Sequence, residues 1–174
     1  VYGRVRVRLC RSTSVWWRAR PQPHLRRLRA PISAMQGAES DREARQLPTT
    51  YMFRNLPRTC TAHDLMAELC PYAGEAAIDF LYCPWDKAGD SSMGFGFVNF
   101  ADGRVARSVC SAVDGTWWRV RQGRRPIRVH PAHLQGSVPN LVRYCANNRG
   151  AAIDDIHCPL VFQGGRRLTL HEAV

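Results

Sequence analysis

The strongest constraint on the fold is the eight-residue run MGFGFVNF near the middle of the chain, at residues 93–100. Side chains of a β-strand point alternately to the two faces of its sheet, so Phe95 and Phe97 share one face while Val98 and Phe100 share the other. Val98 and Phe100 suit a buried core. The run therefore predicts a strand whose second face carries two aromatic side chains toward solvent or a partner.

The segments before this run predict a strand, a helix and another strand. Residues 51–56 (YMFRNL) and 78–83 (IDFLYC) are apolar and aromatic, and each is followed by a proline, as is typical of strands. Between them, Thr61 and Asp64 form a capping-box signal for the start of a helix. The buried stripe expected on that helix is Ala62, Leu65, Met66 and Leu69, and we expect Pro71 and Gly74 to end it.

The segments after the run predict a second helix and a fourth strand. Asp102 is a suitable cap for a helix whose inward residues are expected to be Val105, Val109, Ala112 and Val113. A polar loop is expected at residues 85–92, before the run. A basic loop follows the second helix, and we expect its Trp117 and Trp118 to pack at the helix exit, with base stacking as the alternative. The fourth strand is expected near residues 127–132.

A third amphipathic helix is expected after Ser137, ending near residues 148–150. Its predicted buried stripe is Val138, Leu141, Val142 and Cys145, with Asn140, Arg143 and Asn147 pointing outward. The apolar segment HCPLVF at residues 157–162 is expected to dock back on the domain.

This order of elements, β-α-β-β-α-β, predicts an α+β fold of the ferredoxin-like type. We expect a sandwich of a four-stranded antiparallel sheet with two helices on one face, and an additional C-terminal helix. The folded domain should cover residues 49–163, with residues 164–174 as a tail. Because the helices cover only one face, Phe95 and Phe97 should lie on the other, where exposed aromatic rings make a platform for unpaired bases.

Several classes of protein are disfavoured by the composition. The seven cysteines include no CxxC pair, so we expect reduced, mostly buried thiols. A zinc site of His130, His133, Cys145, His157 and Cys158 is conceivable, but its spacing fits no familiar ligand pattern. We find no constellation of catalytic residues and predict neither an enzyme nor a cofactor. No run approaches the roughly 18–20 apolar residues of a membrane helix, so no membrane partner is expected.

The octapeptide resembles that of the RNA recognition motif (RRM) at seven of eight positions, counting the free one, and YMFRNL occupies the place of its hexapeptide. Met93 replaces the usual Lys or Arg, and Met52 replaces the usual stacking aromatic residue. With these departures the chain resembles the C-terminal RRM of the Mei-two-like RNA-binding proteins, a family associated with meiosis and development. The shared segments are TTYMFRNLP (49–57), DFLYCPWD (79–86), MGFGFVNF, DGTWW (114–118), AHLQG (132–136) and HCPLVF.

The resemblance implies single-stranded RNA binding over residues 49–163. Phe95 and Phe97 would stack on bases, Met52 would be an apolar shelf and Arg54 a polar contact. Arg128 and His130 are expected on the outer face of the fourth strand, although His130 is equally suited to a structural hydrogen bond. A basic loop supplies candidate phosphate contacts, with a solvated charge run as the alternative: Arg119, Arg121, Arg124 and Arg125. The outward face of residues 78–83 cannot be assigned, because both phases are equally apolar.

Residues 1–48 are predicted to be a disordered, arginine-rich arm. Residues 1–46 hold eleven arginines against three acidic residues, a local charge of +8 in a chain of +11. Three interpretations stay open: an RNA-clamping tail, an organelle transit peptide, and sequence before Met35 that is not native protein. From Met35 on, 16 basic and 14 acidic residues leave only +2. We therefore expect few phosphate contacts and a shallow salt dependence.

Two functions compete at this point. The first is a non-enzymatic RNA-binding protein of post-transcriptional regulation, located inside the cell in the nucleus or cytoplasm. The second is a protein-interaction module on the same scaffold, in which the third helix covers the sheet and contacts a protein partner.

Overall fold

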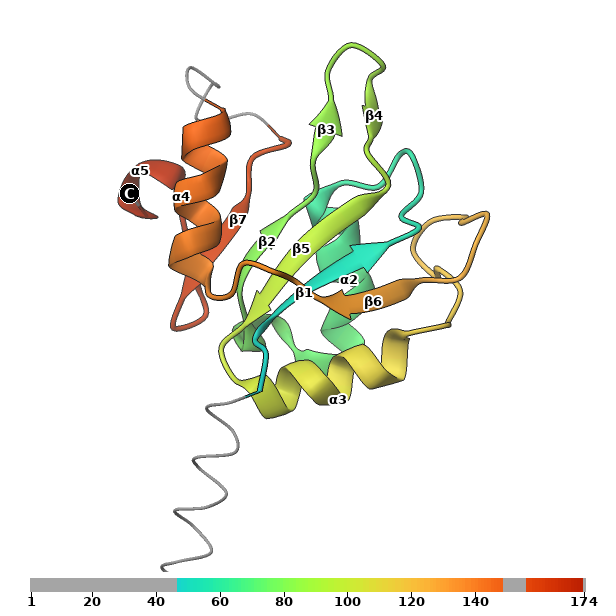
Figure 1. The fold of residues 1–174 in the computed structure, drawn as a ribbon, viewed down its shortest axis with the longest axis horizontal. Helices are drawn as coiled ribbons and strands as arrows, with labels where there is room; N and C mark the ends of the chain where they lie inside the picture. The colour runs from blue at the N-terminus through green and yellow to red at the C-terminus, as the bar shows by residue number, and fades with distance from the viewer. Residues whose placement is uncertain (1–46, 149–155, 174) are drawn as a thin grey trace, which may run out of the picture.

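The computed structural model describes residues 47–148 and 156–173 of the chain (Figure 1). In these ranges the elements are, in chain order, β1 (Thr50–Arg54), α2 (Ala62–Ala73), the 3-10 helix η1 (Glu75–Ala77), β2 (Ile78–Tyr82), β3 (Trp85–Asp86), β4 (Ser91–Ser92), β5 (Phe95–Phe100), α3 (Gly103–Val113), β6 (Arg128–Pro131), α4 (Ser137–Asn147), β7 (Leu160–Gln163), β8 (Arg166–Leu168) and α5 (Leu170–Ala173). The predicted β-α-β-β-α-β order is confirmed by β1, α2, β2, β5, α3 and β6. All but the last two residues of the predicted arm lie outside the described ranges.

The sheet has six strands in the order β6-β1-β5-β2-β7-β8, so the prediction of four strands was wrong. β7 pairs with β2. In a four-stranded sheet β2 would be an edge strand, and its outer backbone N–H and C=O groups would have no strand partner. Gly164 and Gly165, with φ of 57° and 79°, then turn the chain into β8. Residues 164–174, expected as a tail, thus supply β8 and α5.

Residues 85–92, expected as a polar loop, fold into a separate two-stranded hairpin of β3 and β4. The hairpin projects beyond the end of the main sheet (Figure 1). The ring of Trp85 at its base stacks on the ring of His157, with centroids 4.0 Å apart and planes 12° from parallel. The hairpin is therefore tied to the segment that leads into β7.

The main core lies between the sheet and the helices α2 and α3. The stripe predicted on α2 is buried at all four positions, and the capping box of Thr61 and Asp64 is present. Pro71 lies inside α2, which continues to Ala73 and is followed by Gly74 at its C-cap. On α3, Val109 and Val113 are buried as predicted, but Ala112 is exposed because the buried stripe is centred on Ala106 and Cys110.

Gly96 in β5 is a point of close contact between the sheet and Leu65 of α2. A Cβ atom built on Gly96 would lie 2.9 Å from the side chains of both Leu65 and Cys83, well inside normal contact distance. A larger side chain here would push α2 away from the sheet. The helix therefore packs against a strand whose inward position is empty.

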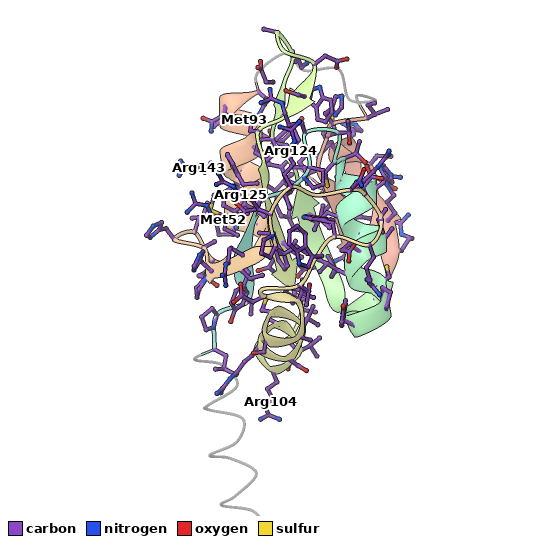
Figure 2. All side chains as sticks on the ribbon, turned by 90° about the vertical axis from the view of Figure 1, so that its right-hand side faces the viewer. Met52, Met93, Arg104, Arg124, Arg125 and Arg143 are labelled. Carbon is purple, nitrogen blue, oxygen red and sulfur yellow. The ribbon has the colours of Figure 1, made fainter. Side chains whose placement is uncertain are left out.

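α4 lies on the opposite side of the sheet from α2, as the nearly edge-on view of Figure 2 shows. The predicted stripe of α4 was wrong in part: Leu141 is buried, but Val138 and Val142 are 68% and 62% exposed. The helix is rotated so that Asn140 and Tyr144 are buried instead. Asn140 donates hydrogen bonds to the carbonyls of Leu134 and Gly136, so its buried amide group has partners. The spacing of apolar residues gave no sign of this polar contact.

Within the described ranges, no helix is both long and apolar enough to span a membrane. Six cysteines lie in these ranges, four of them buried, and none of the six forms a disulfide with another described cysteine. Burial raises the pKa of the Cys110 thiol to about 12. No group of three or more His, Cys, Asp or Glu side chains among the described residues could hold a metal ion, so the candidate zinc residues do not converge.

The packing at Gly96 yields a stability prediction. Gly96→Ala should lower the free energy of unfolding by about 1–3 kcal/mol, because the added methyl group overlaps Leu65 and Cys83. Ser108→Ala, at an exposed position of α3, is the control and should change it by less than about 0.5 kcal/mol. Urea unfolding followed by circular dichroism measures both. A Gly96→Ala variant as stable as the unchanged chain would contradict the close approach.

Candidate nucleic-acid interface

Two rows of side chains cross the outer face of the sheet, on the side away from α2 and α3. The strand register places Arg128, Arg54 and Phe95 side by side in the first row. The second row runs His130, Met52, Phe97 and Tyr82 across β6, β1, β5 and β2. All six residues predicted from the sequence as base or backbone contacts of β1, β5 and β6 therefore lie together on one face.

The centre of this face is aromatic and only half-covered. Phe95 and Phe97 are partly exposed, and their rings meet edge to face with centroids 5.8 Å apart and planes at 81°. Met52 is partly exposed between Phe97 and His130. Exposed aromatic side chains with cations beside them are suited to stack unpaired bases and to contact the strand's phosphates.

Tyr82 is a member of the second row that the sequence could not assign. The register between β2 and β5 shifts between Ile78 and Phe80, so Asp79 is an extra residue in β2. Such a β-bulge breaks the alternation of faces. It explains why Ile78 belongs to the main core, whereas Phe80 and Tyr82 belong to the outer face.

α4 covers one half of the outer face and leaves the other half open (Figure 1). A second apolar cluster, the outer cluster, is formed by Phe80, Leu141 and Val161. Phe97 and Tyr82 pack against its border, and the rings of Tyr82 and Tyr144 meet edge to face at 4.9 Å. The open area thus consists of β6, β1 and β5.

The comparison with protein families agrees with this arrangement. The family model described as RNA recognition motif 2 matches residues 48–145, more than half of the 174-residue chain. The chain belongs to the RNA recognition motif 2 family. Among curated proteins, no significant sequence match was found.

Solved RRM structures are also similar to this chain. A structure described as the Sxl-lethal protein/RNA complex is 26% identical with a TM-score of 0.43, covering 48% of this chain and 47% of that chain. The Rna15 RRM with bound RNA (GU) is 16% identical with a TM-score of 0.45, covering 57% and 98%. The first two RRM domains of the yeast poly(U)-binding protein Pub1 are 20% identical with a TM-score of 0.40, covering 49% and 47%. The chain therefore spans about half the length of the first and third of these proteins.

The cations of the RRM face are held loosely. Arg54 is exposed and forms no hydrogen bond or ion pair with the residues that the structure describes. Arg128 lies 3.7 Å from the carboxylate of Asp114, with both side chains about half exposed. An exposed pair at this distance contributes little to stability, so the Arg128 guanidinium can exchange partners.

Two of the four arginines of the basic loop are committed to α2. The carboxylate of Glu68, which is 1% exposed, accepts hydrogen bonds from the backbone N–H groups of Arg119 and Val120 and from Nε of Arg119. Arg121 donates to Asp64 at 3.0 Å. Burial alone would raise the pKa of Asp64, but hydrogen bonds from Thr61 and Arg121 outweigh it and hold that pKa below its usual value.

Arg124 and Arg125, the other two arginines, line a pocket between this loop and the segment after β1. The same loop carries the two tryptophans, and their exposure differs. Trp118 is buried and donates a hydrogen bond to the carbonyl of Asn55 at 3.2 Å, as expected for a packing residue. Trp117 is 59% exposed, so the prediction that it packs at the helix exit was wrong.

A polar network fixes where α4 begins. The side chain of Gln135 accepts hydrogen bonds from the N–H groups of Thr49 and Thr50 and donates to the carbonyl of Thr50. Thr50 Oγ1 donates to Asn99 Oδ1, and Asn99 Nδ2 donates to Asp79, at 2.6 and 2.7 Å. The junction 132–136 is thereby tied across this end of the sheet, and α4 follows over β2.

Asp79 is the charged member of this network. Burial raises the pKa of Asp79, and hydrogen bonds from Asn99 and from Ser137 only partly offset that increase. The folded RRM therefore binds the Asp79 proton more tightly than the unfolded chain does. Ionisation of Asp79 therefore costs more in the folded protein. The free energy of unfolding falls as the pH rises from the ordinary aspartate pKa through the raised pKa of Asp79.

Asp79→Asn should remove this pH dependence. Relative to the unchanged chain, the variant should gain stability between pH 3 and pH 7, because the asparagine pays no cost of ionisation. Urea unfolding over that pH range measures the difference, with Asp86→Asn, at an exposed position of β3, as the control. A variant that loses stability relative to the unchanged chain as the pH rises would contradict the raised pKa.

Glu68 gives a second prediction about the RRM. Glu68→Ala should lower the free energy of unfolding by roughly 2–4 kcal/mol, because two backbone N–H groups lose their buried acceptor. Glu68→Gln keeps an acceptor oxygen and should lose less. Ser108→Ala, at the exposed position of α3 used above, serves as the control. Equal stability of the alanine and glutamine variants would show that the acceptor is unimportant.

Proposed function

We propose that this chain binds single-stranded RNA through the open half of its RRM sheet. The observation that carries the proposal is the pair of cross-strand rows, in which Phe95 lies next to Arg54 and Phe97 lies next to Met52. Unpaired bases would stack on Phe95 and Phe97, with Met52 as a shelf. Membership of the RNA recognition motif 2 family supports the same activity.

The polar residues of the rows have complementary roles in this proposal. Arg54 and Arg128 are planar cations that can stack on a base or bind a phosphate in two-pronged fashion. His130 stands at the exposed end of the second row and would hydrogen-bond a base edge. Binding needs no bond to be made or broken, so we propose a non-enzymatic role.

The residues of the sheet also support a finer assignment. Met52 and Met93 stand where the general RRM pattern has an aromatic residue and a basic residue. Met93 is 59% exposed, and Met52 is partly exposed; both are labelled in Figure 2. These departures, with the helix and apolar segment after β6, are the basis for proposing a Mei-two-like RNA-binding protein. The proposed process is post-transcriptional regulation in meiosis or development, in the nucleus or cytoplasm.

A second function is favoured by the coverage of the other half of the sheet. α4 buries part of the outer face and exposes Val138 and Val142 one helical turn apart. In this alternative the RRM scaffold contacts a protein partner through α4. A chemical-shift titration with mixed oligonucleotides discriminates the two: shifts at Phe95 and Phe97 support RNA binding, whereas an unchanged sheet face supports the protein-interaction module.

The decisive variant removes the aromatic platform. The double variant Phe95→Ala and Phe97→Ala should weaken binding to RNA selected from a randomised single-stranded pool by roughly 30-fold or more, because each stacked base contributes about 1–3 kcal/mol. Fluorescence anisotropy measures the affinity, and circular dichroism checks the fold.

The matched control is Trp117→Ala, which removes an exposed aromatic ring outside the two rows. It should leave the affinity within about twofold. Retained affinity in the double variant, with the fold intact, would overturn the proposed stacking. Failure of the pool to yield any bound RNA would overturn the proposed function itself.

A further inference from the structure

A pocket of about 310 Å³ lies beyond the C-terminal end of β1, the strand that places Arg54 in the first row. It is lined by residues 55–59 on one side and by Gln122, Arg124 and Arg125 on the other. Its volume is near the lower limit of small-ligand sites, so it suits a group smaller than a drug-sized molecule. Segments far apart in the sequence build it: the loop after β1 and the loop before β6.

The first wall of the pocket is held rigidly. Asn55 has a positive φ of 63°, and its side chain donates a hydrogen bond to the carbonyl of Pro126 at 2.8 Å. The carbonyl of Asn55 in turn accepts from the buried Trp118. Both bonds connect this wall to the loop that carries Arg124 and Arg125, so the two sides are fixed relative to each other.

Arg58 is fixed as well. Its carbonyl accepts a hydrogen bond from the backbone N–H of Ser92 at 2.7 Å, and its guanidinium donates to Ser91 Oγ at 2.8 Å. One guanidinium nitrogen is thereby anchored, which leaves other N–H groups for a ligand. The pocket is preorganised by its neighbours before any ligand enters.

The pocket is strongly cationic. Three arginines line it and no carboxylate does. Arg124 and Arg125 are exposed and form no ion pair with the described residues, in contrast to Arg119 and Arg121 of the same loop, which bind Glu68 and Asp64. A phosphate is the group that best satisfies several convergent guanidinium groups.

The pocket also joins the stacking platform. The backbone N–H of Leu56 donates to the carbonyl of Gly94 at 3.0 Å, next to Phe95. Asn55 directly follows Arg54, which pairs with Phe95 in the first row. The mouth of the pocket therefore lies close to the position of a base that would stack on Phe95.

We propose that this pocket binds a phosphate of the RNA strand, next to the nucleotide that stacks on Phe95, through Arg58, Arg124 and Arg125. The proposal rests on the proposed function and adds Arg58 to the interface. It also divides the basic loop: Arg119 and Arg121 stabilise the fold, whereas Arg124 and Arg125 bind the ligand. The pocket would fix where along its length the strand crosses the sheet.

The first test is the salt dependence of RNA binding. The double variant Arg124→Ala and Arg125→Ala should reduce the slope of log affinity against log salt by about 1.4, as expected for two lost phosphate contacts on a single strand. The control, Arg104→Ala and Arg107→Ala, removes the same charge from α3; Figure 2 shows Arg104 far from Arg124 and Arg125. The control should leave the slope nearly unchanged.

The second test uses inorganic phosphate alone. Phosphate added to the full chain should shift the backbone amide resonances of residues 55, 56, 58 and 59 and of residues 122–125. The shifts should persist in the Phe95→Ala and Phe97→Ala variant, which lacks the stacking platform, and should be lost when Arg124 and Arg125 are replaced.

These outcomes separate the pocket from the platform. An unchanged salt slope in the Arg124 and Arg125 variant, with binding still abolished by loss of both phenylalanines, overturns the pocket and leaves the proposed function standing. An equal loss of slope in the α3 control also overturns it, because net charge would then explain the effect. Phosphate shifts without any change in slope would mean that the pocket holds free phosphate and not the strand.

Discussion

The close packing of α2 on β5 at Gly96 is the contact on which both faces of the sheet depend. Because Gly96 points inward and leaves room for Leu65, its neighbours Phe95 and Phe97 must point outward. A slip of one residue in the register of β5 would bury both rings and place Val98 and Phe100 in solvent. The geometry that closes the main core therefore also places the aromatic platform, and neither can change without the other.

A second constraint decides how much of that platform stays open. The hydrogen bonds of Gln135 to β1 tie the chain after β6 to the start of the neighbouring strand, and the buried pair of Thr50 and Asn99 lies beneath the junction. α4 must then begin near β2 and covers that half of the sheet. The outer cluster forms because the hydrogen-bonded junction at residues 132–136 places α4 over β2. The proposed RNA-binding surface and the outer cluster thus occupy different halves of the same face.

Sequence reasoning recovered what strict periodicity encodes. The α2 stripe, its capping box and the phase of β5 follow from local spacing, and the structure has all three.

Periodicity failed where a tertiary contact overrides it. Asn140 is buried because two carbonyls outside its helix accept its hydrogen bonds, which rotates α4. The bulge at Asp79 inverts the phase of β2 part-way along the strand. Gly164 and Gly165 were a legible hairpin signal, but the strands beside them are only four and three residues long. The pocket of Arg58 could not be anticipated, since its two walls come from loops about 65 residues apart in the chain. The roles of the site residues in binding stay predictions.

The β7–β8 hairpin has a further consequence for how the molecule behaves in solution. In a four-stranded sheet, β2 would be an outer strand of sequence IDFLY, with a row of free backbone groups beside aromatic side chains. Strands of that kind recruit copies of themselves and begin aggregation. Here β2 is enclosed, and the outermost strand on that side is β8, three residues long with two arginines. The opposite margin, β6, is also short and ends in a proline. Both edge strands therefore disfavour the addition of another strand. The aromatic side chains of the sheet are accessible from its outer face and not along an edge.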